Sequence, residues 1–148
     1  MRFCSIASGS SGNCIYVGSE NTHVLVDTGI SGKKMEAGLN SLDLTGRDLD
    51  GILITHEHSD HIKGLGVISR KYGIPIYTTG GTVDAMVRTN ALGKIPDEIF
   101  HEIKEDESFE IGDLTVKPFS IPHDAAQPVG YRLECEGHSV GIATDLGK

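Results

Sequence analysis

Residues 55–61, with the sequence THEHSDH, concentrate side chains that bind metal ions. Imidazole nitrogens and carboxylate oxygens are preferred ligands of Zn²⁺, iron and Mn²⁺, and this segment offers both in His56, His58, Asp60 and His61. A solvated polar loop with chance histidines is the alternative, but so many polar groups directly after an apolar run are costly without a cation. We therefore predict a metal centre here.

The spacing of these side chains predicts two metal ions. His56 and His58 are two residues apart and can face one ion. Asp60 and His61 are neighbours at the expected start of a helix, which can turn them toward a second ion. Two ions roughly 3.5–4 Å apart can share a hydroxide and hold both the attacking and the leaving oxygen of a hydrolysis reaction.

Four apolar runs of the chain each end in a potential ligand. The runs 24–26, 52–55, 116–122 and 141–144 are followed by Asp27, His56, His123 and Asp145. Strand ends in layered folds are places where functional groups converge, because loops there are free while the sheet is rigid. We therefore expect these four side chains to meet at one site.

The remaining pattern predicts strands mixed with covering helices in one layered α+β domain. Strands are expected at 2–7, 14–18, 23–27, 51–55, 74–78, 108–111, 114–121, 130–135 and 139–144. Helices are expected at 31–39, 59–72 and 82–92, the last with Thr82 as its N-cap. The Gly- and Ser-rich residues 8–13 are either a tight turn or a set of backbone N–H groups for a phosphate.

Composition narrows the class of protein. The 148 residues carry a formal charge of −8, which argues against a general nucleic-acid coat protein or a binder of anionic membranes. No apolar run approaches the ~20 residues of a membrane-spanning helix. The odd number of cysteines, Cys4, Cys14 and Cys135, without a CxxC motif, predicts reduced core thiols and a cytoplasmic location.

No functional role is expected for the other polar residues near these motifs. Glu57 lies between two predicted ligands and is expected to face solvent. His23, His101 and His138 lie in polar or turn-like surroundings and are expected to be ordinary surface histidines.

The pattern His56-x-His58-x-Asp60-His61 after an apolar strand resembles the signature of the metallo-β-lactamase-fold hydrolases. Asp27 in VDTG resembles the family's first motif, His123 its third and Asp145 in TDLG its fourth, and the opening SGSSGNC resembles the WalJ-type subgroup. The resemblance implies an αββα sandwich. Residues 1–148 would be a single domain that holds its first half and the opening strands of the second, truncated at the C-terminus.

The resemblance also implies the ligand sets. Metal 1 would be held by His56, His58 and His123, metal 2 by Asp60 and His61, with Asp145 as the bridge and Asp27 as a supporting residue beside the metals. The two ions would be divalent, zinc first, with Mn or Fe as alternatives. The family's final His, which completes metal 2, has no counterpart here, and the shortened chain is expected to self-associate.

A hydrolase using a metal-bound hydroxide is the leading functional hypothesis, since metal binding lowers the pKa of water from 15.7 to about 7. Asp60 would orient the hydroxide and help the leaving group take its proton. Two dications with Asp60, Asp145 and one hydroxide leave a positive site suited to an anionic phosphodiester or carboxylate. The WalJ-type resemblance implies nuclease-like activity on DNA, with no membrane partner. The alternatives are an iron-dependent oxidoreductase of the same fold and a non-catalytic, truncated metal-binding fragment.

Overall fold

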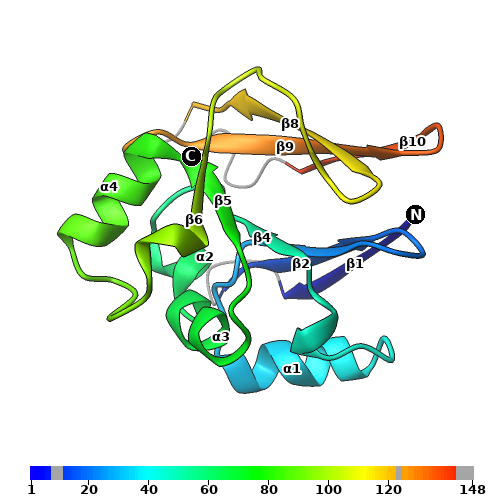
Figure 1. Cartoon of the computed structure of the whole chain (residues 1–148), viewed down its shortest axis with the longest axis horizontal. Coiled ribbons are helices and arrows are strands. Elements are labelled where there is room, and N and C mark those ends of the chain that lie inside the picture. Colours follow the sequence, from blue (N-terminus) through cyan, green and yellow to red (C-terminus); the bar gives the residue numbers. More distant parts are fainter. Residues whose placement is uncertain (8–11, 123–124, 143–148) are drawn as a thin grey trace.

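Two β-sheets lie face to face, and helices cover the outer side of the first sheet (Figure 1). The structure is a computed structural model that describes residues 1–7, 12–122 and 125–142, with the backbone alone for residues 59 and 60. This layered α+β arrangement confirms the predicted fold class. No helix within these described residues is long and apolar enough to cross a membrane.

The first sheet has six strands in sequential order, and the second has four. The first contains β1 Arg2–Ala7, β2 Cys14–Gly18, β3 His23–Val26, β4 Gly51–Leu53, β5 Ile76–Thr79 and β6 Phe100–Ile103. The second contains β7 Phe109–Ile111, β8 Leu114–Ser120, β9 Val129–Cys135 and β10 His138–Ile142, in the order β10-β9-β8-β7. The helices are α1 Gly32–Asn40, α2 Ser59–Ile62, α3 Leu65–Tyr72 and α4 Gly80–Arg88, with short 3₁₀ turns η1 Gly46–Asp48 and η2 Asp97–Ile99.

Strand direction in the first sheet sets the position of the loops. Strands β1, β2 and β3 pair antiparallel, whereas β3, β4, β5 and β6 run parallel. Each parallel connection contains a helix, as parallel strands require. The carboxyl ends of β3, β4 and β5 therefore lie along one edge of the sheet, and the loops after them can build a common site.

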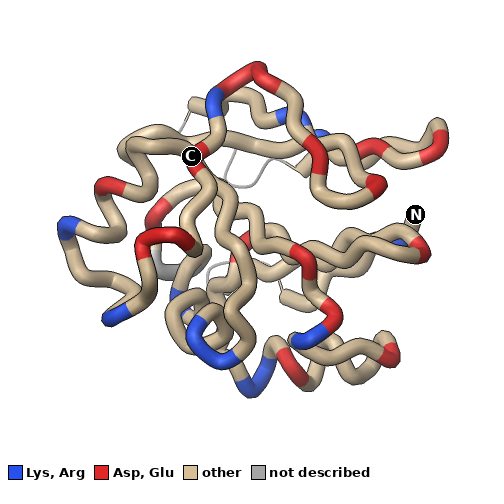
Figure 2. Tube along the Cα trace, viewed as in Figure 1, with Lys and Arg blue, Asp and Glu red and all other residues tan. Residues whose placement is uncertain are grey.

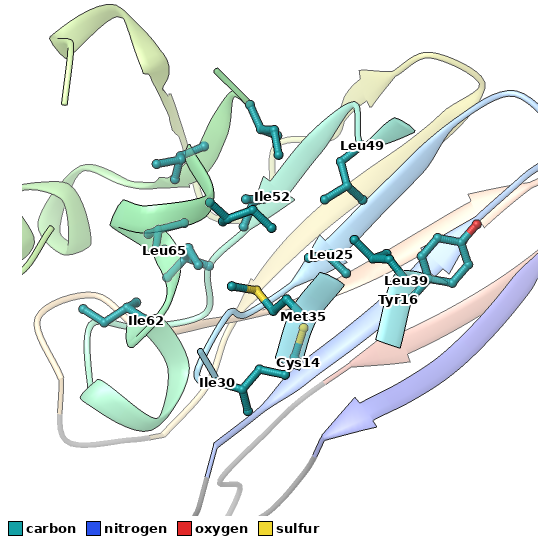
Figure 3. Close-up of a cluster of buried hydrophobic side chains, with 14 of the residues drawn as sticks. Cys14, Tyr16, Leu25, Ile30, Met35, Leu39, Leu49, Ile52, Ile62 and Leu65 are labelled. Atoms are coloured by element: carbon teal, nitrogen blue, oxygen red, sulfur yellow. The ribbon is translucent and has the colours of Figure 1, made fainter. Parts of the chain in front are cut away.

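Alternating apolar side chains give the first sheet two buried faces. On the helix side, Tyr16 and Leu25 pack with Met35 and Leu39 of α1 and with Leu65 of α3 (Figure 3). Neighbouring positions on the same strands point to the second sheet. There, the buried side chains between the sheets include Val17, Val24, Val26, Leu53, Leu114, Val116, Tyr131 and Leu133.

The predicted helix 59–72 is two helices, α2 and α3, interrupted at Lys63 and Gly64. The N–H of Gly64 donates to the Thr28 carbonyl at 2.7 Å, and a Cβ at position 64 would collide with the Ile30 carbonyl oxygen. Apolar spacing continues through the break, so the sequence pattern did not reveal it. Close packing of the chain after β3 requires the glycine and ends α2 early.

The bounds predicted for the helix 82–92 and the strand 51–55 were wrong, and one strand was not predicted. Helix α4 begins at Gly80 with Thr79 as its N-cap and ends at Arg88, so Thr82 lies inside the helix. Strand β4 ends at Leu53, two residues before the end that was predicted at Thr55. Strand β6 was not predicted, because its sequence FHEI contains adjacent exposed polar residues and lacks the apolar alternation of a strand. It is a strand because parallel pairing with β5 supplies its hydrogen bonds.

Candidate metal centre

The predicted site lies at the carboxyl ends of β3 and β4. Asp27 follows β3 directly, and its N–H donates to the Leu53 carbonyl at 2.7 Å. The next residue, Thr28, donates its N–H to the His61 carbonyl at the same distance. These bonds hold the chain after β3 against α2, so the structure brings Asp27 together with the 55–61 segment.

Asp27 is the organising residue of this site. Its side chain is only 1% exposed, and its backbone φ of 63° lies in the left-handed region that few non-glycine residues adopt. Carboxylate Oδ1 accepts the N–H of Thr55 at 2.8 Å. Carboxylate Oδ2 accepts the Thr55 hydroxyl at 2.8 Å and lies 2.5 Å from Nδ1 of His61.

The Asp27 contact determines the tautomer of His61. A carboxylate is only an acceptor, so Nδ1 of His61 must carry the proton, and Nε2 keeps its lone pair in the neutral ring. Nε2 lies 3.3 Å from the side-chain nitrogen of Asn13. A carboxylate bonded to one ring nitrogen while the other faces a ligand position is the usual support of a metal-binding histidine.

The three imidazoles of residues 55–61 are packed against one another. The ring centroid of His56 is 3.9 Å from that of His61 and 4.7 Å from that of His58. The rings of His56 and His61 are fully buried, and that of His58 is partly buried. The backbone N–H of His58 donates to Nδ1 of His56 at 3.3 Å, which orients the first ring.

The buried charge of Asp27 favours a cation in this place. Among the described residues, the ion-pair partner of Asp27 is His61, which is a cation only when doubly protonated. Burial, and secondarily the Asp27 carboxylate, raises the pKa of the Cys14 thiol to about 12. Burial, and secondarily the Asp27 carboxylate, also raises the pKa of the Tyr131 hydroxyl well above its usual value. Clustered imidazoles beside a buried carboxylate thus fit a divalent metal ion.

Part of the predicted ligand set lies outside the described residues. These are His123 and Asp145, together with the side chain of Asp60. Within the described part of the chain, no three His, Cys, Asp or Glu side chains form a group that could hold a metal ion by themselves. The described portion of the site is the imidazole cluster with its supporting residues.

Glu57 is half-buried and makes a specific contact that the sequence did not predict. Its carboxylate accepts the backbone N–H of Ala126, with Oε2 at 3.0 Å. The side chain thereby joins the 55–61 segment to the connection between β8 and β9. Nothing in the local sequence indicated this, because the partner is a backbone group 69 residues away.

Sequence reasoning also missed two supporting residues, Asn13 and Thr55. The Asn13 carbonyl accepts the N–H of Gly29 at 2.8 Å, and its amide reaches His61. The position of Asn13, polar and directly before a buried strand, was the available signal. The sequence places Thr55 only at the end of the predicted strand 51–55, but both its N–H and its hydroxyl bond to Asp27.

The other histidines make contacts elsewhere. His101 and His138 are exposed, as expected. His101 stacks on Tyr77 with ring centroids 4.9 Å apart. His23 is partly buried, and its Nδ1 lies 2.6 Å from the Tyr16 hydroxyl, so it belongs to the protein interior more than the sequence indicated.

A family model described as the metallo-beta-lactamase superfamily matches residues 7–148. The chain belongs to the metallo-β-lactamase superfamily. The match covers the whole region in which the resemblance was recognised, from the Gly- and Ser-rich turn to Asp145. The prediction of the family is confirmed.

Curated relatives agree on the subgroup. The chain is 42% identical to the protein named exodeoxyribonuclease YycJ of Bacillus anthracis, over 99% of this chain and 55% of that protein. It is 40% identical to exodeoxyribonuclease WalJ of Streptococcus pneumoniae D39, over 99% of this chain and 54% of that protein. The chain thus spans about 55% of the length of these relatives.

Solved structures show the same fold at low sequence identity. A metallo-β-lactamase from Cronobacter sakazakii aligns with a TM-score of 0.77 and 17% identity, over 91% of this chain and 58% of that one. The Rm3 metallo-β-lactamase aligns with a TM-score of 0.76 and 21% identity, over 94% and 56%. These similarities establish the arrangement of layers.

Proposed function

We propose that this chain provides the metal-binding part of a hydrolase that cleaves phosphodiester bonds in DNA with two divalent ions, most simply zinc. The observation that carries the proposal is the buried imidazole cluster held by the Asp27–His61 contact of 2.5 Å. The names of the two exodeoxyribonuclease relatives support DNA as the substrate.

The roles of the side chains follow the family pattern. The ligand sets would be His56, His58 and His123 for one ion, and Asp60 and His61 for the other, with Asp145 between them. When bound, such ions supply a hydroxide nucleophile at neutral pH and neutralise charge on the phosphate. The protein's own part is to hold His61 in the Nδ1–H tautomer through Asp27. Asp60 would accept and return the proton of the reaction.

The distribution of charge supports a path for an anionic substrate. Residues 95–148 contain twelve Asp and Glu against four Lys and Arg, whereas residues 32–94 contain eight Lys and Arg against seven Asp and Glu. Figure 2 shows mainly acidic residues along the β6–β10 part, and basic residues mixed with acidic ones along the helices. Exposed Lys63 follows His61 by two residues, and exposed Lys33 lies in α1. We infer that a DNA strand approaches the site from the helical side.

Metal analysis and a DNA cleavage assay on the same preparation test this proposal. We expect two zinc ions per chain and cleavage of end-labelled DNA that a chelator abolishes. His58→Ala and Asp60→Ala should each lose cleavage, and His58→Ala should also lose bound zinc. Asp84→Ala, an exposed change on α4, is the matched control and should cleave normally. Cleavage that persists in both variants and in chelator, or a chain that binds two zinc ions yet leaves DNA intact, would overturn the proposal.

A further inference from the structure

The connection between β8 and β9 is tied to the 55–61 segment and to the start of α4. At its end, the N–H of Val129 donates to the Thr55 carbonyl at 2.9 Å. One residue before Gln127, the N–H of Ala126 donates to Glu57 at 3.0 Å. Gln127 itself binds the start of α4. Two of these ties therefore end on the 55–61 segment that contains the imidazole cluster.

Gln127 uses both its backbone and its side chain for this attachment. Its carbonyl accepts the hydroxyl of Thr79, a fully buried side chain, at 2.8 Å. Its side-chain Oε1 accepts the N–H of Gly81 at 2.9 Å. Its Nε2 donates to Oε1 of Glu105 at 3.1 Å. Each polar group of the amide is thus directed at a defined partner.

The Glu105 carboxylate, which accepts the hydrogen bond from Gln127, is itself fixed by a second hydrogen bond. Its second oxygen, Oε2, accepts the Ser120 hydroxyl at 2.6 Å, at the end of β8. The bonds from Ser120 and Gln127 hold the pKa of Glu105 below its usual value, so the group is a carboxylate at neutral pH. Glu105 therefore joins the two ends of the connection, residues 120 and 127.

We propose that Gln127 and Glu57 are positioning residues that fix the β8–β9 connection at the metal centre. This connection carries His123, the predicted third imidazole of the first ion, so the inference rests on the proposed function. A ligand on an untethered connection must be ordered when metal binds, and this ordering weakens the affinity. Outer contacts that orient ligands are commonly worth 10–100-fold in metal affinity.

Zinc affinity is the appropriate measurement, made by competition with a chromophoric chelator on the intact chain. Gln127→Ala and Glu57→Ala are each expected to weaken zinc binding by about 10–100-fold. Glu57→Gln keeps an oxygen that can accept the Ala126 N–H and should bind zinc nearly as the wild type does. Glu107→Gln, an exposed change near Glu105, is the matched control.

Exchanging the side chains of Gln127 and Glu105 distinguishes the loss of their hydrogen bond from a general loss of stability. Gln127→Glu alone places two carboxylates together and should weaken zinc binding. Adding Glu105→Gln restores one donor and one acceptor with the groups exchanged, and should recover the affinity. Amide hydrogen exchange of residues 125–129 should rise in Gln127→Ala and return to the wild-type rate in the exchanged pair. Thermal unfolding of each metal-free variant shows that it is folded.

The outcomes separate the two proposals. A wild-type chain that binds no zinc overturns both the metal centre and this inference. A wild-type chain that binds zinc, with Gln127→Ala and Glu57→Ala binding equally well, overturns the positioning role alone. Weakened binding that the exchanged pair does not restore also overturns it, because the effect is then not carried by the hydrogen bond. Zinc binding with the expected variant pattern but no DNA cleavage leaves the positioning role standing and removes the nuclease.

Discussion

Asp27→Asn is expected to remove the carboxylate oxygen that supports His61 while leaving the packing of the site nearly unchanged. Asparagine has nearly the same volume as aspartate, and its oxygen can still accept the Thr55 N–H. Its NH₂ group replaces the oxygen that lies 2.5 Å from Nδ1 of His61. Two donors would then face each other, unless His61 moves its proton to Nε2.

The magnitude follows from these contacts. A hydrogen bond to a charged group contributes about 1.5–3 kcal/mol, partly offset here because a buried charge is removed. We therefore expect Asp27→Asn to lower the free energy of unfolding of the metal-free chain by about 1–3 kcal/mol. A proton on Nε2 of His61 blocks its ligand position, so zinc affinity should fall by about 10–100-fold. Asp27→Ala removes both oxygens that accept from Thr55 and lie against His61, and should destabilise the chain more.

Urea unfolding, zinc titration and ¹⁵N chemical shifts of the His61 ring measure these effects separately. Asp84→Asn, which removes the charge of an exposed carboxylate on α4, should change none of them. Asp27→Asn with the wild-type His61 tautomer and zinc affinity within twofold of wild type would refute the reasoning. In that case the Asp27 carboxylate would not control the tautomer.

Three further outcomes are expected. Burial raises the pKa of the Cys14 thiol to about 12, so Cys14 should resist alkylation at pH 8 until the chain is unfolded. Mass spectrometry follows the alkylation, and rapid labelling of the native chain would contradict the burial of this thiol. Glu36 has a pKa held below 4.5 by hydrogen bonds from Lys71 and Tyr72, so its stabilising contribution is present above pH 4.5 and is lost as the pH falls through the lowered value. The unfolding free energies of wild type and Glu36→Gln should therefore converge in acid, and a difference independent of pH would be inconsistent with this. Gly64→Ala should lower the unfolding temperature, because its Cβ would meet the Ile30 carbonyl oxygen; an unchanged temperature would show that the turn can relax.

Much of the architecture was predictable because it depends on local signals. Strands β1 and β2 were predicted with the bounds that the structure has, since each is a short, mainly apolar run next to turn-forming Gly- and Ser-rich residues. Strand β6 was not, because its stability comes from pairing with β5 and leaves little trace in its own residues. The break between α2 and α3 also depends on a distant segment, the chain around Ile30.

The sequence by itself determined the family, because the spacing His56-x-His58-x-Asp60-His61 within one short segment resembles that of the superfamily whose model matches residues 7–148. The residue types in this segment predict metal chemistry. The sequence could not determine which groups hold those residues. The carboxylate on His61 comes from Asp27, 34 residues earlier, and the backbone group on Glu57 comes from Ala126, 69 residues later. Hydrogen bonds between distant segments depend on how strands pair and sheets stack, so only the tertiary structure decided them.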